Sequence, residues 1–192
     1  WRDLPDDLIE RTKQCLLDWF AVTIAGAQDD LTDILVKEAQ EDGATGNASL
    51  VGRSEKTLPS MAALINGAAS HALDYDDVNF AMGGHPTVTV VPALLALGEQ
   101  MRASGHLFIE SFVAGYETSG RIGRLVAPSH YLKGFHVTGT VGSFSATAAA
   151  GTATRMRTSS SRTGVRMRQF PPGGLPATAG GPRASRGSFL GD

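Results

Sequence analysis

The sequence is short of several features that define large classes of protein. Cys15 is the single cysteine among 192 residues, which excludes an internal disulfide, a cysteine-based zinc site and an iron–sulfur cluster. No apolar run reaches the roughly 18 residues that a membrane-spanning helix needs, and no signal-peptide pattern opens the chain. The net charge of −2 argues against a strongly basic nucleic-acid binder. We therefore expect a soluble, cytoplasmic protein that contacts neither membrane nor nucleic acid and needs no cofactor.

The small net charge conceals two parts of opposite charge. Residues 155–192 contain seven arginines and one acid, a charge of +6, whereas residues 1–154 contain 10 basic and 18 acidic groups, a charge of −8. In the basic part, 29 of 38 residues are Arg, Gly, Pro, Ala, Ser or Thr. Such a segment buries too little apolar surface to offset its chain entropy, so we expect disorder. A shifted reading frame through GC-rich DNA gives the same composition, and we favour the hypothesis that this tail is not native sequence.

The first 154 residues show the periodicity of a mostly helical domain. Apolar residues recur at helical spacing, and the strand–helix alternation of a doubly wound sheet is missing, so we predict an all-α fold. Asp6 or Asp7 is the expected cap of the first helix, and Pro92 should kink or interrupt the fourth. Small residues after His136 favour a helix in close contact with its neighbours over a flexible segment. The predicted helices span 5–27, 31–40, 59–73, 86–100 and 107–124, with a sixth after His136 and a short strand or extended link at 48–51.

Polar residues concentrate where the predicted third helix ends. His71 is followed by the carboxylates Asp74, Asp76 and Asp77, and then by His85 in a Gly-Gly-His-Pro segment. Carboxylates this close oppose one another's ionisation, and a histidine beside them can act as an acid near neutral pH. A solvated helix end accounts for the same residues equally well. A metal site is the weaker alternative, because His71 and Asp74 are three residues apart with no second matching pair.

A second polar segment runs from Lys133 to Thr140. Gly134 precedes His136, and Thr138 follows it. Glycine lets the backbone approach a ligand closely, and the free N–H groups of a helix start favour a carboxylate. The segment is not a phosphate-binding loop of the Walker type, because no Gly-Lys-Ser/Thr ends it. An ordinary helix start with a capping hydroxyl is an equal alternative.

Taken together, these motifs resemble those of the MmgE/PrpD family, which includes 2-methylcitrate dehydratase, cis-aconitate decarboxylase and iminodisuccinate epimerase. The resemblance implies a large helical domain beside a smaller α/β lid domain, with the active site between them, usually in a homodimer. Residues 1–154 would then be the first part of the helical domain, without the lid. The resemblance runs from about Leu4 to Thr154 and rests on His71-Ala-Leu-Asp-Tyr-Asp-Asp77, His85-Pro86, Gly115-Tyr-Glu117, Arg121-Ile-Gly123, Gly134-Phe-His136 and Thr138-Gly-Thr140.

The resemblance also implies which side chains react. The positions that line the site in the decarboxylase branch fall on Asp74, His85 and His136, and Val78 stands where that branch can carry a threonine. We expect Asp74 or His85 to remove a proton beside a substrate carboxylate and His136 to protonate a leaving hydroxyl, or the reverse assignment. Five further candidates are expected at the site: His71 and Asp77 to orient the imidazoles, and Lys133, Thr138 and Thr140 to contact the substrate.

The sequence thus predicts a fragment of a lyase of the 2-methylcitrate dehydratase type, acting on a di- or tricarboxylate. Decarboxylase-like or epimerase activity is an alternative, because the chemistry again centres on a carbon beside a carboxylate. A third hypothesis is an inactive helical module, truncated before the lid and before the lysines that the family carries farther along. Helices that normally pack on the rest of a larger domain would expose apolar faces here, so we also expect self-association.

Overall fold

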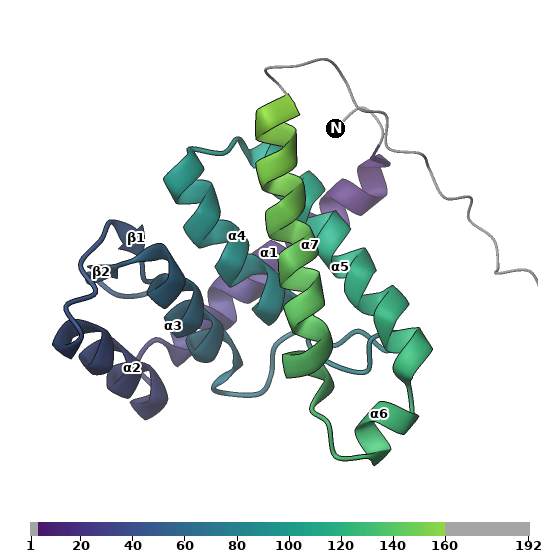
Figure 1. The fold of residues 1–192 in the computed structure, drawn as a ribbon, viewed down its shortest axis with the longest axis horizontal. Helices are drawn as coiled ribbons and strands as arrows, with labels where there is room; N and C mark the ends of the chain where they lie inside the picture. Colours follow the sequence, from purple (N-terminus) through teal and green to yellow (C-terminus); the bar gives the residue numbers. More distant parts are fainter. Residues whose placement is uncertain (1–3, 160–192) are drawn as a thin grey trace, which may run out of the picture.

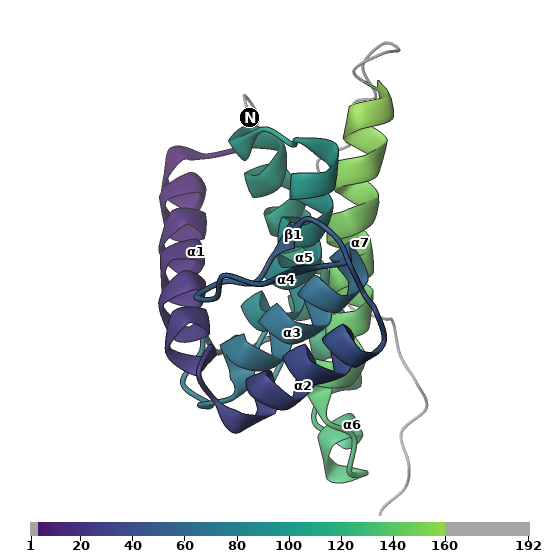
Figure 2. The same ribbon diagram turned by 90° about the vertical axis from the view of Figure 1, so that its left-hand side faces the viewer.

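The computed structural model describes residues 4–159, which are mainly helical (Figure 1). Helix α1 lies on one side and helix α7 on the other, with other helices between them (Figure 2). The predicted all-α class is confirmed, and the one sheet among the described residues is a two-stranded antiparallel pair. The elements are α1 (Asp6–Gly26), α2 (Asp30–Glu41), β1 (Ala48–Ser49), β2 (Lys56–Thr57), α3 (Pro59–His71), α4 (Thr87–Met101), α5 (Gly105–Val126), α6 (Ser129–Leu132) and α7 (Val137–Ser159).

Most helix boundaries follow the sequence signals. Pro59 begins α3, where its missing N–H is not needed, and Asp29 caps α2 by accepting a hydrogen bond from a first-turn N–H at 2.9 Å. The aspartate cap predicted for α1 is wrong. The residue before this helix is Pro5, and Asp7 accepts only from the N–H of the adjacent Leu8. The short helix α6 was not expected, because four residues are too few to show a period.

Helix α4 continues through Pro92, so the predicted interruption is absent. Proline has no N–H to donate to the carbonyl of Val88, one turn earlier. This turn is buried against α3, where a Cβ added at Gly67 would lie 3.7 Å from Pro92 Cγ. Pro92 thus packs on α3 beside Gly67, and α4 continues through this turn without that hydrogen bond.

The largest core lies between α1, α4, α5 and α7. Trp19 of α1 is 1% exposed and Phe112 of α5 is 2% exposed. Helices α5 and α7 approach closely at Gly115, where a Cβ would lie 2.8 Å from the Ser145 carbonyl oxygen. The small residues of α7 therefore serve helix packing, as predicted. The buried residues of this core are Trp19, Val88, Val90, Val91, Leu94, Phe112, Ala149 and Ala153.

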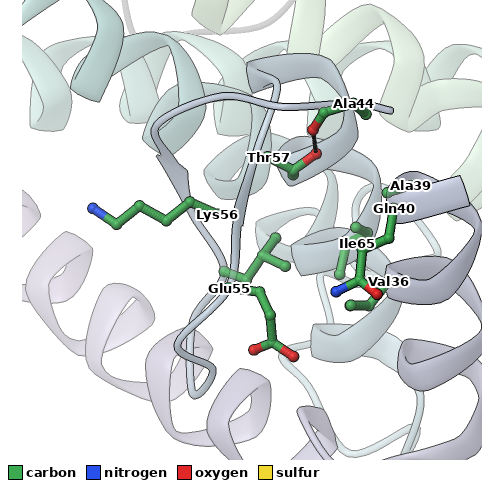
Figure 3. A pocket seen from close by; sticks show the side chains of 9 residues that line it. Val36, Ala39, Gln40, Ala44, Glu55, Lys56, Thr57 and Ile65 are labelled. Atoms are coloured by element: carbon green, nitrogen blue, oxygen red, sulfur yellow. Dashed lines mark hydrogen bonds between the residues drawn. The ribbon is translucent and has the colours of Figure 1, made fainter. Parts of the chain in front are cut away.

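A small pocket lies where α2 and β2 meet α3 (Figure 3). Its volume of about 30 Å³ has room for a water molecule but not for a metabolite. Beside it, Thr57 Oγ1 donates to the carbonyl of Ala44 at 2.7 Å, which ties β2 to the segment after α2. We regard this end of the molecule as structural. The lining residues are Val36, Ala39, Gln40, Ala44, Leu50, Glu55, Lys56, Thr57 and Ile65.

Two connections carry the polar residues that the sequence singles out. One joins α3 to α4 over residues 72–86, and the other joins α5 to α7 over residues 127–136 and includes α6. Both lie at the lower end of the helices in Figure 1. Met82 of the first connection is fully buried against Val137 and Val141 at the start of α7. This contact brings together two motifs that are far apart in the sequence.

Helix α7 continues to Ser159, beyond the Thr154 boundary predicted for the domain. The first residues of the predicted tail are therefore helical rather than irregular, and residues 160–192 lie outside the described residues. Within residues 4–159, no helix combines the length and apolar character needed to cross a membrane.

Helix α1 carries an apolar stripe on its outer face. Leu17, Phe20 and Ile24 recur at helical spacing and are 73%, 39% and 56% exposed. Exposed apolar faces of this kind are predicted from the sequence, and their exposure is confirmed. Self-association through them stays a prediction.

Candidate active site

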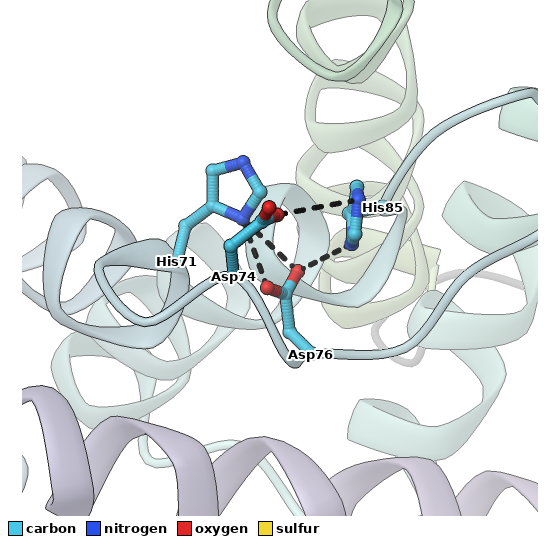
Figure 4. Close-up of side chains that lie close together, drawn as sticks. All are labelled: His71, Asp74, Asp76 and His85. Atoms are coloured by element: carbon cyan, nitrogen blue, oxygen red, sulfur yellow. Dashed lines mark hydrogen bonds and ion pairs between the residues drawn. The ribbon is translucent and has the colours of Figure 1, made fainter.

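A buried carboxylate, that of Asp76, lies between two imidazoles (Figure 4). Nδ1 of His71, the last residue of α3, lies 2.9 Å from Asp76 Oδ1 and 3.1 Å from Oδ2. On the other side, His85 Nδ1 lies 2.9 Å from Asp76 Oδ2, an ion pair when the ring is protonated, although it is not aligned for a hydrogen bond. An ionised carboxylate can only accept, so the hydrogen bond places the proton of a neutral His71 ring on Nδ1 and leaves Nε2 with a lone pair.

Asp74 lies above this arrangement with its carboxylate in solvent. Its backbone has a φ of +53°, a left-handed conformation that aspartate tolerates better than most residues, in the turn that follows α3. Its side chain is 81% exposed, and Asp74 Oδ1 lies 3.9 Å from His85 Nε2. Asp74 therefore faces the nitrogen of His85 that is turned away from Asp76 (Figure 4).

His136 approaches the same place from the second connection. It is exposed and immediately precedes α7, and its ring centroid lies 6.2 Å from that of His71. The rings of His71 and His85 are 4.9 Å apart. The structure thus gathers the predicted residues Asp74, His85 and His136 around His71.

Asp77 points away from the imidazoles, so the prediction that it orients them is wrong. Its Oδ2 accepts from Thr87 Oγ1 at 2.7 Å and from the Tyr116 hydroxyl at 3.3 Å, and its Oδ1 accepts from Thr87 N at 3.2 Å. Burial raises the pKa of the Asp77 carboxyl, partly offset by these hydrogen bonds. The orienting role belongs to Asp76, whereas Asp77 anchors the connection to the first residue of α4.

Thr138 and Thr140 hold the two connections in place. Thr138 is 5% exposed, and its Oγ1 accepts from His85 N at 3.1 Å, so it supports the backbone of His85 rather than contacting a substrate as expected. Thr140 Oγ1 donates to the carbonyl of His136 at 3.0 Å and lies 2.7 Å from His130 Nε2. The Thr140 hydroxyl therefore links the ring of His130 to the backbone of His136.

A cavity of about 300 Å³ adjoins the connection that carries His136. It is within the size range of small-molecule sites, but its walls are largely apolar, so it does not suit the carboxylate end of a substrate. Lys133 is exposed at the end of α6 and is not among the lining residues. Those residues are Met82, Gly83, Val126, Ala127, Pro128, His130, Tyr131 and Val137.

Sequence reasoning missed two residues of this arrangement. Asp76 was visible as one of three neighbouring acids, but only the turn after α3 decides which carboxylate faces inward. His130 had no sequence signal. It is placed by α6 and by stacking of its ring on Phe135 at 4.8 Å, and it supports the backbone of His136 through Thr140.

A family model supplies the decisive comparison. The MmgE/PrpD N-terminal domain model matches residues 1–167. The chain belongs to the MmgE/PrpD family. The resemblance drawn from the motifs is confirmed, and the match continues beyond Thr154, where the sequence analysis ended it.

Several curated MmgE/PrpD-type relatives are similar to this chain. The cis-aconitate decarboxylase-like protein oryM of Aspergillus oryzae is 29% identical over 157 residues, which cover 77% of this chain and 32% of that protein. The cis-aconitate decarboxylase of Mus musculus is 29% identical over 153 residues, covering 77% and 31%. That of Homo sapiens is 29% identical over 153 residues, covering 77% and 32%. The chain therefore spans about a third of the length of these relatives.

Proposed function

We propose that this chain supplies the acid–base part of a lyase site that acts on a di- or tricarboxylate. The observation that carries the proposal is the group formed by Asp74, His85 and His136 around His71, with the Asp76 carboxylate between the rings of His71 and His85. Imidazoles and carboxylates are the usual groups for moving protons near neutral pH. Holding them in one place provides a base and an acid on the same substrate.

The 2-methylcitrate dehydratase reaction is the first candidate. A base removes the proton from a carbon beside a carboxylate, and the electron pair forms the double bond as the hydroxyl leaves, protonated by the acid, as water. Asp74 and His85 come from the connection between α3 and α4, and His136 comes from the connection between α5 and α7, so base and acid are supplied by separate segments. Protonated imidazoles also offset the negative charge that builds on the substrate carboxylate.

Decarboxylation of cis-aconitate is a second candidate, favoured by the names of the relatives. Here the carbon–carboxylate bond breaks, CO₂ leaves, and the remaining electron pair takes a proton from an acid of the site. The chain needs one protonated imidazole for this step, and His136 or His85 serves. Both candidates use the same residues, so the substrate decides between them.

Titration of the purified chain with carboxylates tests the proposal. Calorimetry with cis-aconitate and 2-methylcitrate should show saturable binding that weakens in Asp74→Asn and His136→Gln. Asp42→Asn, an exposed aspartate at the end of α2, is the charge-matched control and should leave binding unchanged. The same samples are assayed for CO₂ release and for loss of water, which assigns the reaction. Absence of binding, or binding that ignores both site variants, would refute the proposal.

The remaining expectations concern partners and location. We propose the family-type homodimer, supported by the exposed apolar stripe of α1, and a cytoplasmic location. Sedimentation of the purified chain at several concentrations tests the first, and a Leu17→Lys variant should lower the association. Fractionation of the native cells tests the second.

A further inference from the structure

His71, Asp74, Asp76 and His85 bring four potential metal ligands into one cluster. One donor atom from each residue lies within 4.8 Å of the donor atoms of the others (Figure 4). In a tetrahedral zinc site with bonds of about 2.0–2.2 Å, neighbouring donor atoms are about 3.4 Å apart. Asp74 Oδ1 and His85 Nε2 lie 3.9 Å apart, which is close to that spacing. Small side-chain adjustments would therefore bring them to an ion.

The position of Asp76 is the one that metal-binding histidines require. A histidine that binds a metal through one nitrogen usually donates its other N–H to a carboxylate, which fixes the ring. Asp76, with a side chain only 1% exposed, faces Nδ1 of His71 and Nδ1 of His85. This leaves Nε2 of each ring for a ligand, and Asp74 already faces Nε2 of His85.

The charge of the cluster also favours a dication. Across residues 4–159, the ion pairs formed by Asp74 and Asp76 are with His71 and His85, and none is with a lysine or arginine. With neutral imidazoles the two carboxylates leave a charge of about −2, which a divalent ion balances. Imidazole nitrogen selects transition metals such as Zn²⁺ over Mg²⁺ or Ca²⁺, which prefer oxygen.

We propose that this cluster binds one divalent transition-metal ion, with His71, His85 and Asp74 as ligands and with Asp76 as the carboxylate that accepts from His71 Nδ1 and lies beside His85 Nδ1. A metal was the weaker expectation from sequence because the spacing of His71 and Asp74 has no second matching pair; the connection between α3 and α4 provides the missing ligands in space. Metal binding at this cluster does not depend on the proposed lyase function. Because Asp74 and His85 are also the two candidates for the base of the proposed lyase reaction, a bound ion would inhibit that reaction.

The test measures Zn²⁺ binding to the purified chain by competition with a chromophoric zinc indicator in the absence of any carboxylate. One ion per chain is expected. Asp74→Asn and His71→Gln remove ligands, and each should weaken binding by at least the roughly 10- to 100-fold that loss of an outer-shell partner causes. Asp76→Asn should weaken it by about 10- to 100-fold. Mg²⁺ at the same concentration should not compete.

Three controls make the result decisive. Asp42→Asn and His106→Gln change an aspartate and a histidine outside the cluster, and Cys15→Ser removes the single thiol, so all three should bind as the parent does. Circular dichroism checks that each variant keeps its helices; Asp74 is 81% exposed, so Asp74→Asn remains informative if the buried Asp76 variant unfolds. X-ray absorption at the zinc edge should show nitrogen and oxygen neighbours only.

Two results would overturn the proposal: more than one weakly held ion per chain unaffected by Asp74→Asn and His71→Gln, or sulfur in the zinc environment together with loss of binding in Cys15→Ser. If the chain does not bind Zn²⁺ at this cluster, the test of the lyase proposal by carboxylate titration is unaffected, because those titrations are made without metal. Conversely, a chain that binds Zn²⁺ at this cluster but no carboxylate would refute the lyase proposal alone.

Discussion

The carboxylates of Asp76 and Asp77 belong to adjacent residues but serve different partners. Asp76 lies between the imidazoles of His71 and His85, whereas Asp77 accepts hydrogen bonds from Thr87 and Tyr116. One carboxylate therefore holds the rings while its neighbour fixes the connection to α4. The two roles can be separated by substitution, because each side chain can be changed without touching the contacts of the other.

Replacing Asp76 should change which nitrogen of His71 carries the proton. In the parent, the Nδ1 proton is held by the carboxylate at 2.9 Å. In Asp76→Ala that acceptor is gone, so the neutral ring should move toward the Nε2-protonated form. Nitrogen-15 NMR of the imidazole rings measures the tautomer directly. His130, whose Nε2 lies 2.7 Å from Thr140 Oγ1, is an internal control whose signals should stay in place; an unchanged His71 spectrum would contradict the assigned contact.

Replacing Asp77 should destabilise the fold rather than alter the rings. Asp77→Ala leaves Thr87 N and Oγ1 without their acceptor at the start of α4, and we expect a loss of about 1–3 kcal/mol in the free energy of unfolding. Tyr116→Phe removes the hydroxyl's contacts to Asp77 and Asn79 but leaves both Thr87 hydrogen bonds in place, and it should have a smaller effect. Denaturant titration followed by circular dichroism measures the free energy of unfolding of each variant and shows which loss is larger. A Tyr116→Phe loss equal to that of Asp77→Ala would show that Thr87 is not the main partner.

The sequence predicted the helices well because their signals are local. Pro59 and the apolar periodicity act locally, so the boundaries of α2 and α3 followed. The site residues Asp74, His85 and His136 came from motifs that resemble the family. Asp76 and His130 could not be found in this way. Their roles depend on how two connections fold against each other, as in the contact between Met82 and Val137, which no local pattern encodes.

The thiol of Cys15 should react slowly with alkylating reagents. Burial, and next the charge of Asp77, raises the pKa of this thiol above its usual value of 9.0. Because the thiolate is the reactive form, alkylation by iodoacetamide at pH 8 should be slower in the folded chain than in denaturant, and it should accelerate as the pH rises. Mass spectrometry at timed intervals gives both rates. Equal rates in the folded and unfolded chain would show that the thiol is not protected.

Arg53 should stabilise the segment between β1 and β2 in a pH-dependent way. Its guanidinium is 3.1 Å from Glu55, 2.6 Å from Asp33 and 2.8 Å from the carbonyl of Ala27. The hydrogen bond from Arg53 lowers the pKa of Glu55 in the folded chain below its ordinary value of 4.5. The unfolded chain therefore binds a proton first on acidification, so this stabilisation is present above about pH 4.5 and is lost as the pH falls through the folded-state pKa.

The matching experiment compares the parent with Glu55→Gln by thermal unfolding across a pH series. The melting temperature of the variant should be lower at pH 7, and the two curves should converge in acid. A difference that persists unchanged at low pH would mean that Glu55 acts through packing rather than charge. Arg53→Gln removes the contacts to all three partners and should lower the free energy of unfolding by about 1–3 kcal/mol.

Two glycines in helices should respond oppositely to alanine. A Cβ at Gly123 of α5 would lie 2.6 Å from the carbonyl oxygen of Met82, so Gly123→Ala must push the 72–86 connection away and should cost about 1–3 kcal/mol. Gly151 of α7 is exposed, with no atom within 4 Å of the position that a Cβ would take, so Gly151→Ala should stabilise the helix by about 0.5–1 kcal/mol. Both are measured by denaturant titration. Since Met82 belongs to the connection that carries His85, Gly123→Ala should also weaken carboxylate binding, whereas Gly151→Ala should leave it intact. Equal carboxylate binding by both variants would show that the packing at Gly123 does not affect the geometry of the site.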